Sequence, residues 1–337
     1  MNPYVTPAAP IYDPQTLVSQ VPSNNKKKNW WKYPYFTFLI TLIQVGVFAY
    51  QLYSNYYYTS NPIATHPINF MIGPSRSNLI HQGARFVPCM RQGFTDSPVE
   101  CLQNNNGLGQ PLCPLPEVCG FENFSNGQPN QWFRFITPIF LHAGVLHILF
   151  NLFSQLTLGG HLEKYWGPFR IFFIYFASGI GGFLFGGVYA MPDLPSVGAS
   201  GAIFGLVGCE LVDLIQNWKY IGSPGCQLFK LVITIAINFA LGLLPFIDNF
   251  SHIGGFIVGV LCSILIIPLP SRMPKKVILI KWTFMAVAFG ILVYLFYFGS
   301  TAFYDDKMRE SCTWCKYLNC LPVFPICKNP ISTGNGL

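Results

Sequence analysis

Hydrophobic residues form long runs along this chain of 337 residues, not the short alternating patterns of a half-buried sheet. A helix needs roughly 20 mainly apolar residues to cross the hydrocarbon core of a bilayer. Runs of this kind lie at 35–53, 133–158, 169–189, 198–216, 228–246, 250–268 and 277–298. The pattern therefore predicts an all-α polytopic membrane protein with seven transmembrane helices.

The polar segments complete the predicted domain organisation. Residues 1–34 are polar and contain proline and a lysine run at 26–28, which is typical of a disordered cytosolic tail. Because they lack the apolar core of a signal peptide, we expect the first helix to be a retained anchor. Residues 54–132 are predicted to form an outer loop, 133–268 the core with the second to sixth helices, and 299–337 an outer tail.

Composition and charge support a membrane location and orient the chain. Only 10% of the residues are charged and 16% are aromatic. Starting with the N-terminal lysines in the cytosol, seven crossings put the basic residues of the short loops on the same side, as the positive-inside rule requires. We therefore expect a cytosolic N-terminus and an outer C-terminus. The expected surroundings are the lipid bilayer, and no nucleic-acid partner is expected.

Cysteine usage tests this orientation independently, because disulfides persist only in oxidising compartments. The two outer segments contain Cys89, Cys101, Cys113 and Cys119 in the loop and Cys312, Cys315, Cys320 and Cys327 in the tail. We expect these cysteines to form disulfides in a secretory-pathway membrane, such as the Golgi, the plasma membrane or another endomembrane. A zinc site is the alternative for the four tail cysteines. The glycosylation sequon Asn123-Phe124-Ser125 agrees with an outer loop.

A serine in the fourth apolar run is surrounded by residues with little or no side chain. The segment reads Gly198-Ala199-Ser200-Gly201-Ala202-Ile203-Phe204-Gly205. Another backbone could approach this serine closely. A packing face of small residues, such as Gly201 and Gly205, is the alternative interpretation, since membrane helices use such faces generally.

The sixth run contains His252, and an ionisable side chain within a membrane is costly and suggests function. Ser200 and His252 lie near the starts of helices that run in the same direction, so both are predicted at a similar shallow depth. A serine hydroxyl becomes a good nucleophile when a neighbouring base takes its proton, and histidine suits that role. The alternative is a histidine bonded to a backbone carbonyl. Asp248, one turn earlier, could orient the imidazole or cap the helix, and we favour the cap.

The second run adds three polar side chains, His142, His147 and Asn151. Positions four apart share a helix face, so His147 and Asn151 are predicted to point the same way. Hydrogen-bond donors of this kind stabilise the oxyanion that develops in acyl transfer. Interhelical hydrogen bonding is the alternative role, and it is compatible with the first.

In this order, the His147-xxx-Asn151 pair, the Gly198-x-Ser200-Gly201 serine and the His252-x-x-Gly255 histidine resemble the rhomboid proteases. Arg134, the run 137–144 and Glu163 match as well. The resemblance covers about residues 131–268. The chain is also similar to the eukaryotic secretory-pathway branch of this family, and this similarity implies a six-helix bundle plus one C-terminal helix.

The resemblance implies a Ser200–His252 dyad without a third acid, which supports the cap interpretation of Asp248. It implies an oxyanion hole of Asn151, His147 and the Ser200 amide, in a site that includes Gly198 and Gly201. His142 and Phe204 are possible supporting residues, and Phe204 could stack on the imidazole where bacterial members often have tyrosine.

No cofactor or metal is expected for this site, and the expected substrates are single-span membrane proteins cut in or near their transmembrane segments. A rhomboid-like pseudoprotease that binds membrane helices without cutting them is the alternative. Such relatives typically lose the serine or the histidine, and this chain has both. A transporter or a seven-helix receptor would need a charged path or a ligand pocket, whereas the polar residues cluster at one shallow site.

Overall fold

The computed structural model describes residues 33–65, 68–93, 99–102, 112–120, 124, 129–243, 247–269, 274–305, 312, 315 and 318. The regular secondary structure of this part of the chain is helical apart from one two-stranded antiparallel ribbon, which confirms the all-α prediction. The N-terminal tail, the sequon residues Asn123 and Ser125, and Cys320 and Cys327 lie outside the described residues.

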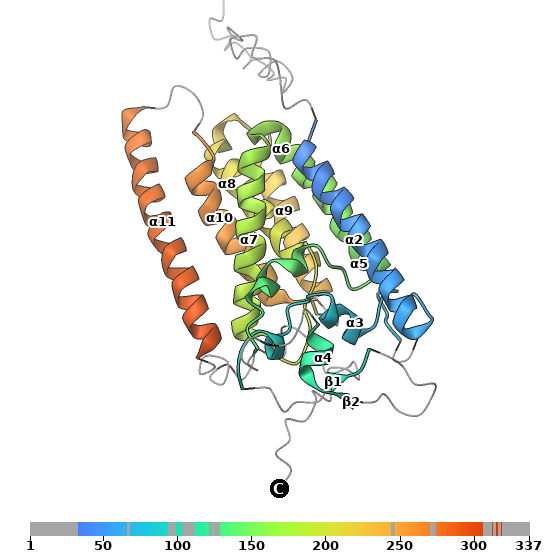
Figure 1. Cartoon of the computed structure of the whole chain (residues 1–337). Helices are drawn as coiled ribbons and strands as arrows, with labels where there is room; N and C mark the ends of the chain where they lie inside the picture. The colour runs from blue at the N-terminus through green and yellow to red at the C-terminus, as the bar shows by residue number, and fades with distance from the viewer. Residues whose placement is uncertain are drawn as a thin grey trace, which may run out of the picture.

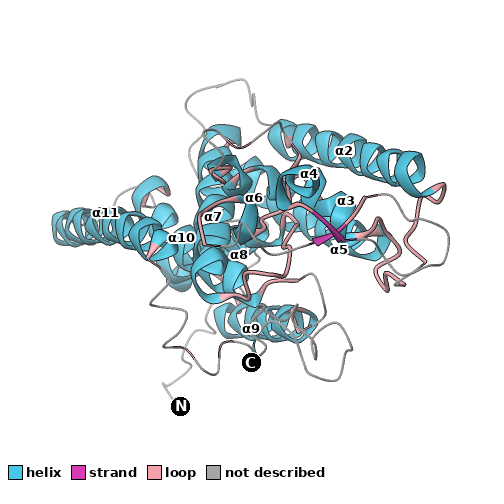
Figure 2. Cartoon of the chain, turned by 60° about the horizontal axis from the view of Figure 1, so that its bottom comes forward, coloured by secondary structure: helices cyan, strands magenta, loops and turns pink. Residues whose placement is uncertain are grey.

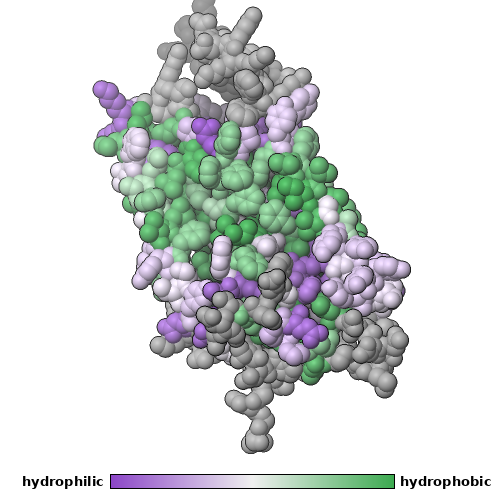
Figure 3. Space-filling model, viewed as in Figure 1, coloured by the Kyte–Doolittle hydropathy of each residue, from purple (hydrophilic) through white to green (hydrophobic). Residues whose placement is uncertain are grey.

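Within the described residues, four helices are long and apolar enough to cross a membrane: α2 (Tyr35–Thr59), α7 (Pro168–Tyr189), α10 (Asn249–Ile266) and α11 (Lys275–Tyr304). Helices α8 (Ser200–Gln216) and α9 (Pro224–Leu241) occupy two further predicted runs. Apolar side chains form a belt between two polar ends of the molecule (Figure 3). The chain is a polytopic membrane protein, and the count of seven crossings stays a prediction.

The second predicted helix begins later than expected. Helix α5 (Val145–Ser154) continues through a π-helical segment, η5 (Gln155–Gly159), into α6 (Gly160–Trp166), whereas a helix from residue 133 was predicted. Before it, the chain forms the 3-10 turns η3 (Trp132–Phe135) and η4 (Thr137–Ile139). Pro138 lacks an N–H and disfavours a continuous helix, and the apolar residues around it pack beneath the outer loop.

Helices α7, α8 and α10 form the centre of the bundle, and α2 and α11 lie on opposite sides of it (Figure 1). The backbones of α8 and α10 approach closely through glycines. A Cβ at Gly255 would collide with the Gly201 carbonyl, and a Cβ at Gly259 with the Gly205 carbonyl. The small-residue packing interpretation of this segment is therefore correct, and the packing brings the starts of α8 and α10 together.

Polar contacts attach α2 to the bundle. The Gln44 side chain donates to the Tyr175 hydroxyl at 3.0 Å, and this hydroxyl donates to Gln155 Oε1 at 2.6 Å. At the other end of α2, the buried Glu163 carboxylate accepts hydrogen bonds from the amides of Phe36 and Thr37, both at 2.8 Å. Glu163 thus satisfies two of the amides that the first turn of a helix leaves unpaired.

A small outer region covers the end of the bundle where α8 and α10 begin (Figure 2). It consists of α3 (Arg76–His81), the 3-10 turn η1 (Val87–Cys89), α4 (Leu115–Cys119), and the ribbon of β1 (Val99–Glu100) and β2 (Leu112–Cys113). The fully buried Arg134 joins this region to η3, because its guanidinium donates to the carbonyls of Ile80, Ala84 and Cys119. A further 3-10 turn, η6 (Trp218–Tyr220), follows α8.

Disulfides connect six of the eight outer cysteines: Cys89–Cys119, Cys101–Cys113 and Cys312–Cys315. The last pair removes two of the four thiolates that the alternative zinc site in the tail required. The tail packs against the start of α10, where the Asn249 side chain donates to the Leu318 carbonyl at 2.7 Å.

Candidate active site

The backbone before α8 places Ser200 at the first position of the helix. Gly198 has a φ of 124°, a conformation that favours glycine, and its amide donates to the Pro138 carbonyl at 2.9 Å. Ser196 pairs through its backbone with Arg85 of the outer region. Since the first amides of a helix have no intrahelical acceptor, the N–H of Ser200 is available to a ligand.

His252, in the first turn of α10, lies within hydrogen-bonding distance of the serine. Its Nε2 atom is 2.8 Å from Ser200 Oγ. The Phe204 ring stacks on the imidazole, with ring centroids 4.4 Å apart and an interplanar angle of 14°, which confirms the stacking expected of this phenylalanine. The imidazole is buried, and its Nδ1 atom has no hydrogen-bond partner among the described residues.

Asp248 caps α10 and does not bond to the imidazole. Its Oδ1 atom accepts from the amides of Phe250 and Ser251, which is the geometry of an N-cap. Its Oδ2 atom pairs with Arg85 at 3.1 Å in a buried salt bridge. Burial lowers the pKa of the Arg85 guanidinium, and the Asp248 carboxylate opposes that shift. Of the two interpretations of Asp248, the cap is the correct one.

His147 and Asn151 lie on the same face of α5, as their spacing predicted, and both are buried. His147 Nδ1 accepts a hydrogen bond from the Ala143 amide at 3.4 Å, so in a neutral ring the proton is on Nε2. In the part of the chain that the structure describes, neither His147 Nε2 nor Asn151 Nδ2 has a hydrogen-bond partner, and both lie beside Gly198. Two unpaired donors therefore face the segment that carries the serine.

The serine, the two histidines and the asparagine line one cavity of about 120 Å³, which is room for several waters. His142 does not line this cavity. It is fully buried, and its ring centroid lies 5.5 Å from that of His147. Gly201 contributes through its backbone, because it lets α10 approach α8. The structure thus brings Ser200, His252, His147 and Asn151 together and places His142 behind them.

Sequence reasoning missed three residues around this cavity. Met71 of the outer loop and Asn238 of α9 line it, and Arg85 supports the helix that carries His252. Asn238 interrupts the apolar run of α9, so it could have been noticed. Nothing local distinguishes Met71 or Arg85, because their partners lie far away in the sequence.

Comparison with known proteins identifies the family. Residues 129–269 match the model of the rhomboid domain. Rhomboid-type serine protease 2 of Emericella nidulans is 37% identical over 296 residues, which cover 83% of this chain and 59% of that protein. The chain belongs to the rhomboid family.

Other rhomboid relatives carry a different description. Inactive rhomboid protein 1 is 37% identical over 216 residues in Rattus norvegicus and 36% identical in Homo sapiens. The match covers 62% of this chain and 24% of each of those proteins. This rhomboid chain therefore spans only part of the length of the relatives it matches, and the relatives include proteins described as proteases and as inactive.

Proposed function

We propose that this rhomboid protein is an intramembrane serine endopeptidase that cleaves single-span membrane proteins in or near their transmembrane segments. The observation that carries the proposal is the distance of 2.8 Å between His252 Nε2 and Ser200 Oγ. At this distance the imidazole can take the hydroxyl proton as the serine attacks.

In the first step, Ser200 Oγ bonds to the carbonyl carbon of the substrate, and its proton moves to His252 Nε2. The proton then passes to the leaving nitrogen as the C–N bond breaks, which leaves an acyl-enzyme. Water, deprotonated by the same imidazole, hydrolyses this ester and regenerates the serine. The Phe204 ring holds the imidazole in plane against α8, and no carboxylate is needed at Nδ1.

The oxyanion of each tetrahedral intermediate would be stabilised by His147 Nε2, Asn151 Nδ2 and the Ser200 amide. Two of these donors are unpaired in the structure, and the amide is at the N-terminus of α8, where the helix dipole also favours negative charge. Each such donor typically changes kcat by a factor of about 10² to 10³.

The substrate carbonyl must be freed before attack, because a helical carbonyl is already bonded within its helix. Residues that weaken a helix, such as glycine and proline, would favour this local unwinding. The active site lies near the end of the bundle that the disulfide-bonded outer region covers. We therefore place cleavage near the outer surface of a secretory-pathway membrane.

Cleavage of a reporter tests the proposal. Cells would express a single-span reporter with a destabilised helix together with native enzyme, Ser200→Ala or His252→Ala at matched levels. We expect native enzyme to release the outer domain of the reporter and both variants to release none. Equal behaviour of all three proteins on several reporters would contradict the protease function.

The second candidate function is a scaffold that binds membrane helices without cutting them, and it is favoured by the relatives that are described as inactive. In that case the reporter would co-purify equally with native enzyme and Ser200→Ala, without cleavage by either. The intact dyad favours the protease.

A further inference from the structure

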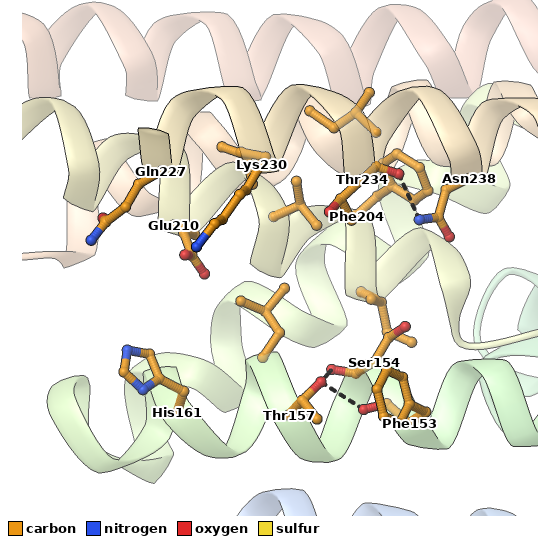
Figure 4. Close-up of a pocket in the computed structure, with 15 residues that line it drawn as sticks. Phe153, Ser154, Thr157, His161, Phe204, Glu210, Gln227, Lys230, Thr234 and Asn238 are labelled. Carbon is orange, nitrogen blue, oxygen red and sulfur yellow. Dashed lines mark hydrogen bonds between the residues drawn. The ribbon is translucent and has the colours of Figure 1, made fainter. Parts of the chain in front are cut away.

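A second and larger cavity adjoins the catalytic one. It has a volume of about 420 Å³ and lies between the α5–α6 helix, α8 and α9 (Figure 4). The residues that line both cavities are Ser154, Ile203, Phe204 and Asn238. The larger cavity therefore continues the catalytic cavity along α8, away from the outer region.

The far end of this cavity is polar and lies toward the C-terminal end of α8 and the start of α9. Its polar side chains, which we call the Glu210 cluster, are His161 of α6, Glu210 of α8, and Gln227 and Lys230 of α9. Figure 4 shows the Lys230 side chain directed toward Glu210, with His161 on the opposite wall. Neither the Glu210 nor the Lys230 side chain forms a hydrogen bond or an ion pair with a described residue.

The Glu210 side chain is half-buried and lines the cavity, and an ionisable group of this kind within a helix of a membrane protein usually serves a function. Glu210 follows Ser200 by ten residues in the same helix, so it lies roughly 15 Å farther along the axis. A substrate helix whose cleaved bond lies at Ser200 would pass the Glu210 cluster about ten residues farther toward the cytosol.

We propose that the Glu210 cluster binds an amide side chain, asparagine or glutamine, at this position of the substrate's transmembrane helix. This inference rests on the proposed protease function. An amide both donates and accepts hydrogen bonds, so it can donate to Glu210 and accept from Lys230 or Gln227. A substrate lysine would face Lys230, a substrate carboxylate would face Glu210, and a leucine would leave the cluster unpaired.

A pair of reporters tests this assignment with full-length enzyme in proteoliposomes. They carry glutamine or leucine ten residues beyond the cleaved bond. We expect native enzyme to cleave the glutamine reporter roughly three- to tenfold faster in kcat/KM, the range of one interhelical hydrogen bond in a membrane. In Glu210→Leu, the ratio of the two rates should fall to about one, whatever the absolute rates.

Two matched controls isolate the cluster. Asp213→Asn should keep the native ratio, because Asp213 is a carboxylate of the same helix that bonds to Asn217 and does not line the cavity. Moving the glutamine two residues along the reporter turns it by about 200° around the helix and should abolish the preference. The inference would be overturned if native enzyme cleaved the glutamine and leucine reporters at equal rates, or if the preference for glutamine survived in Glu210→Leu. Lipid would then be the expected occupant of the cavity.

A binding readout separates this inference from the protease function. A photo-crosslinker at the tenth position of the reporter, incubated with Ser200→Ala, should label α8 or α9 without any cleavage. Labelling there together with no cleavage by native enzyme would reject the protease and, with it, the preference in cleavage rate. Cleavage by native enzyme without labelling of α8 or α9 would reject the cluster as a substrate site and keep the protease.

Discussion

Gly198, two residues before Ser200, packs directly against the His147 and Asn151 side chains of α5. Its φ of 124° is rarely adopted by other residues. A Cβ at this position would lie 2.7 Å from His147 Cε1 and 2.8 Å from His147 Nε2. The position therefore requires glycine both for its backbone conformation and for the space that His147 occupies.

Replacing this glycine tests whether the donor geometry matters. In Gly198→Ala, the His147 ring or the serine backbone must shift, and a displacement of about 1 Å in an active site can cost roughly 10²-fold in rate. We expect at least that loss in kcat for reporter cleavage in proteoliposomes. Gly46→Ala is the control, because a Cβ at Gly46 meets nothing within 4 Å. Native activity in Gly198→Ala would show that cleavage does not depend on the position of the His147 ring.

At the scale of single residues, the sequence was informative where a polar group interrupts an apolar run. Ser200, His252, His147 and Asn151 stood out for this reason, and the structure brings them together. The sequence leaves two relations open between His252 and Asp248, because a carboxylate one turn before a histidine can cap the helix or bind the ring. Only the positions of the Phe250 and Ser251 amides decide between the two.

At the scale of elements, Arg85 connects the two segments that carry Ser200 and His252. Its backbone amide and carbonyl both pair with Ser196, at 3.0 Å each, four residues before the nucleophile. Its guanidinium pairs with Asp248, the cap of the helix that carries His252. Because Arg85 lies in the outer loop and 163 residues from Asp248, local sequence patterns could not predict this contact.

We expect Arg85→Met to destabilise the protein by about 3–5 kcal/mol, since it removes the cation that pairs with the buried Asp248 carboxylate. Adding Asp248→Asn should restore part of this stability, because the amide is neutral and still caps α10. Thermal unfolding in detergent measures both effects, and kcat below the unfolding transition reports on the dyad. Arg170→Ala, which removes an exposed guanidinium, should change neither. Native stability and kcat in Arg85→Met would contradict this role.

Helix positions were predicted well from the apolar runs, with one error that has a physical cause. The residues from 133 to 144 are apolar enough to extend the second helix, but Pro138 disfavours a continuous helix there. Arg134 instead takes its hydrogen-bond acceptors from the outer region, at Ile80, Ala84 and Cys119. The apolar content of residues 133–144 predicts that they are buried. Only the long-range contacts of Arg134 show that this segment packs against the outer region.

At the scale of the whole molecule, the apolar belt divides two chemically different ends (Figure 3). The outer region contains two disulfides, and Met71, which precedes it in the chain, lines the same cavity as Ser200. The opposite end contains η6 and the start of α9, where Cys226 is a free, exposed thiol. If disulfides mark the oxidising side, the Cys226 end faces the cytosol.

Cysteine labelling tests this orientation. In sealed microsomes, whose cytosolic face is outward, a membrane-impermeant maleimide should label the protein once, and Cys226→Ser should remove that label. Cys209 and Cys262 should not react, because both are buried and exposure governs thiol reactivity. The disulfide-bonded cysteines should react only after permeabilisation and reduction. If Cys226 reacts only after permeabilisation, the orientation is reversed, and the active site would then open toward the cytosol.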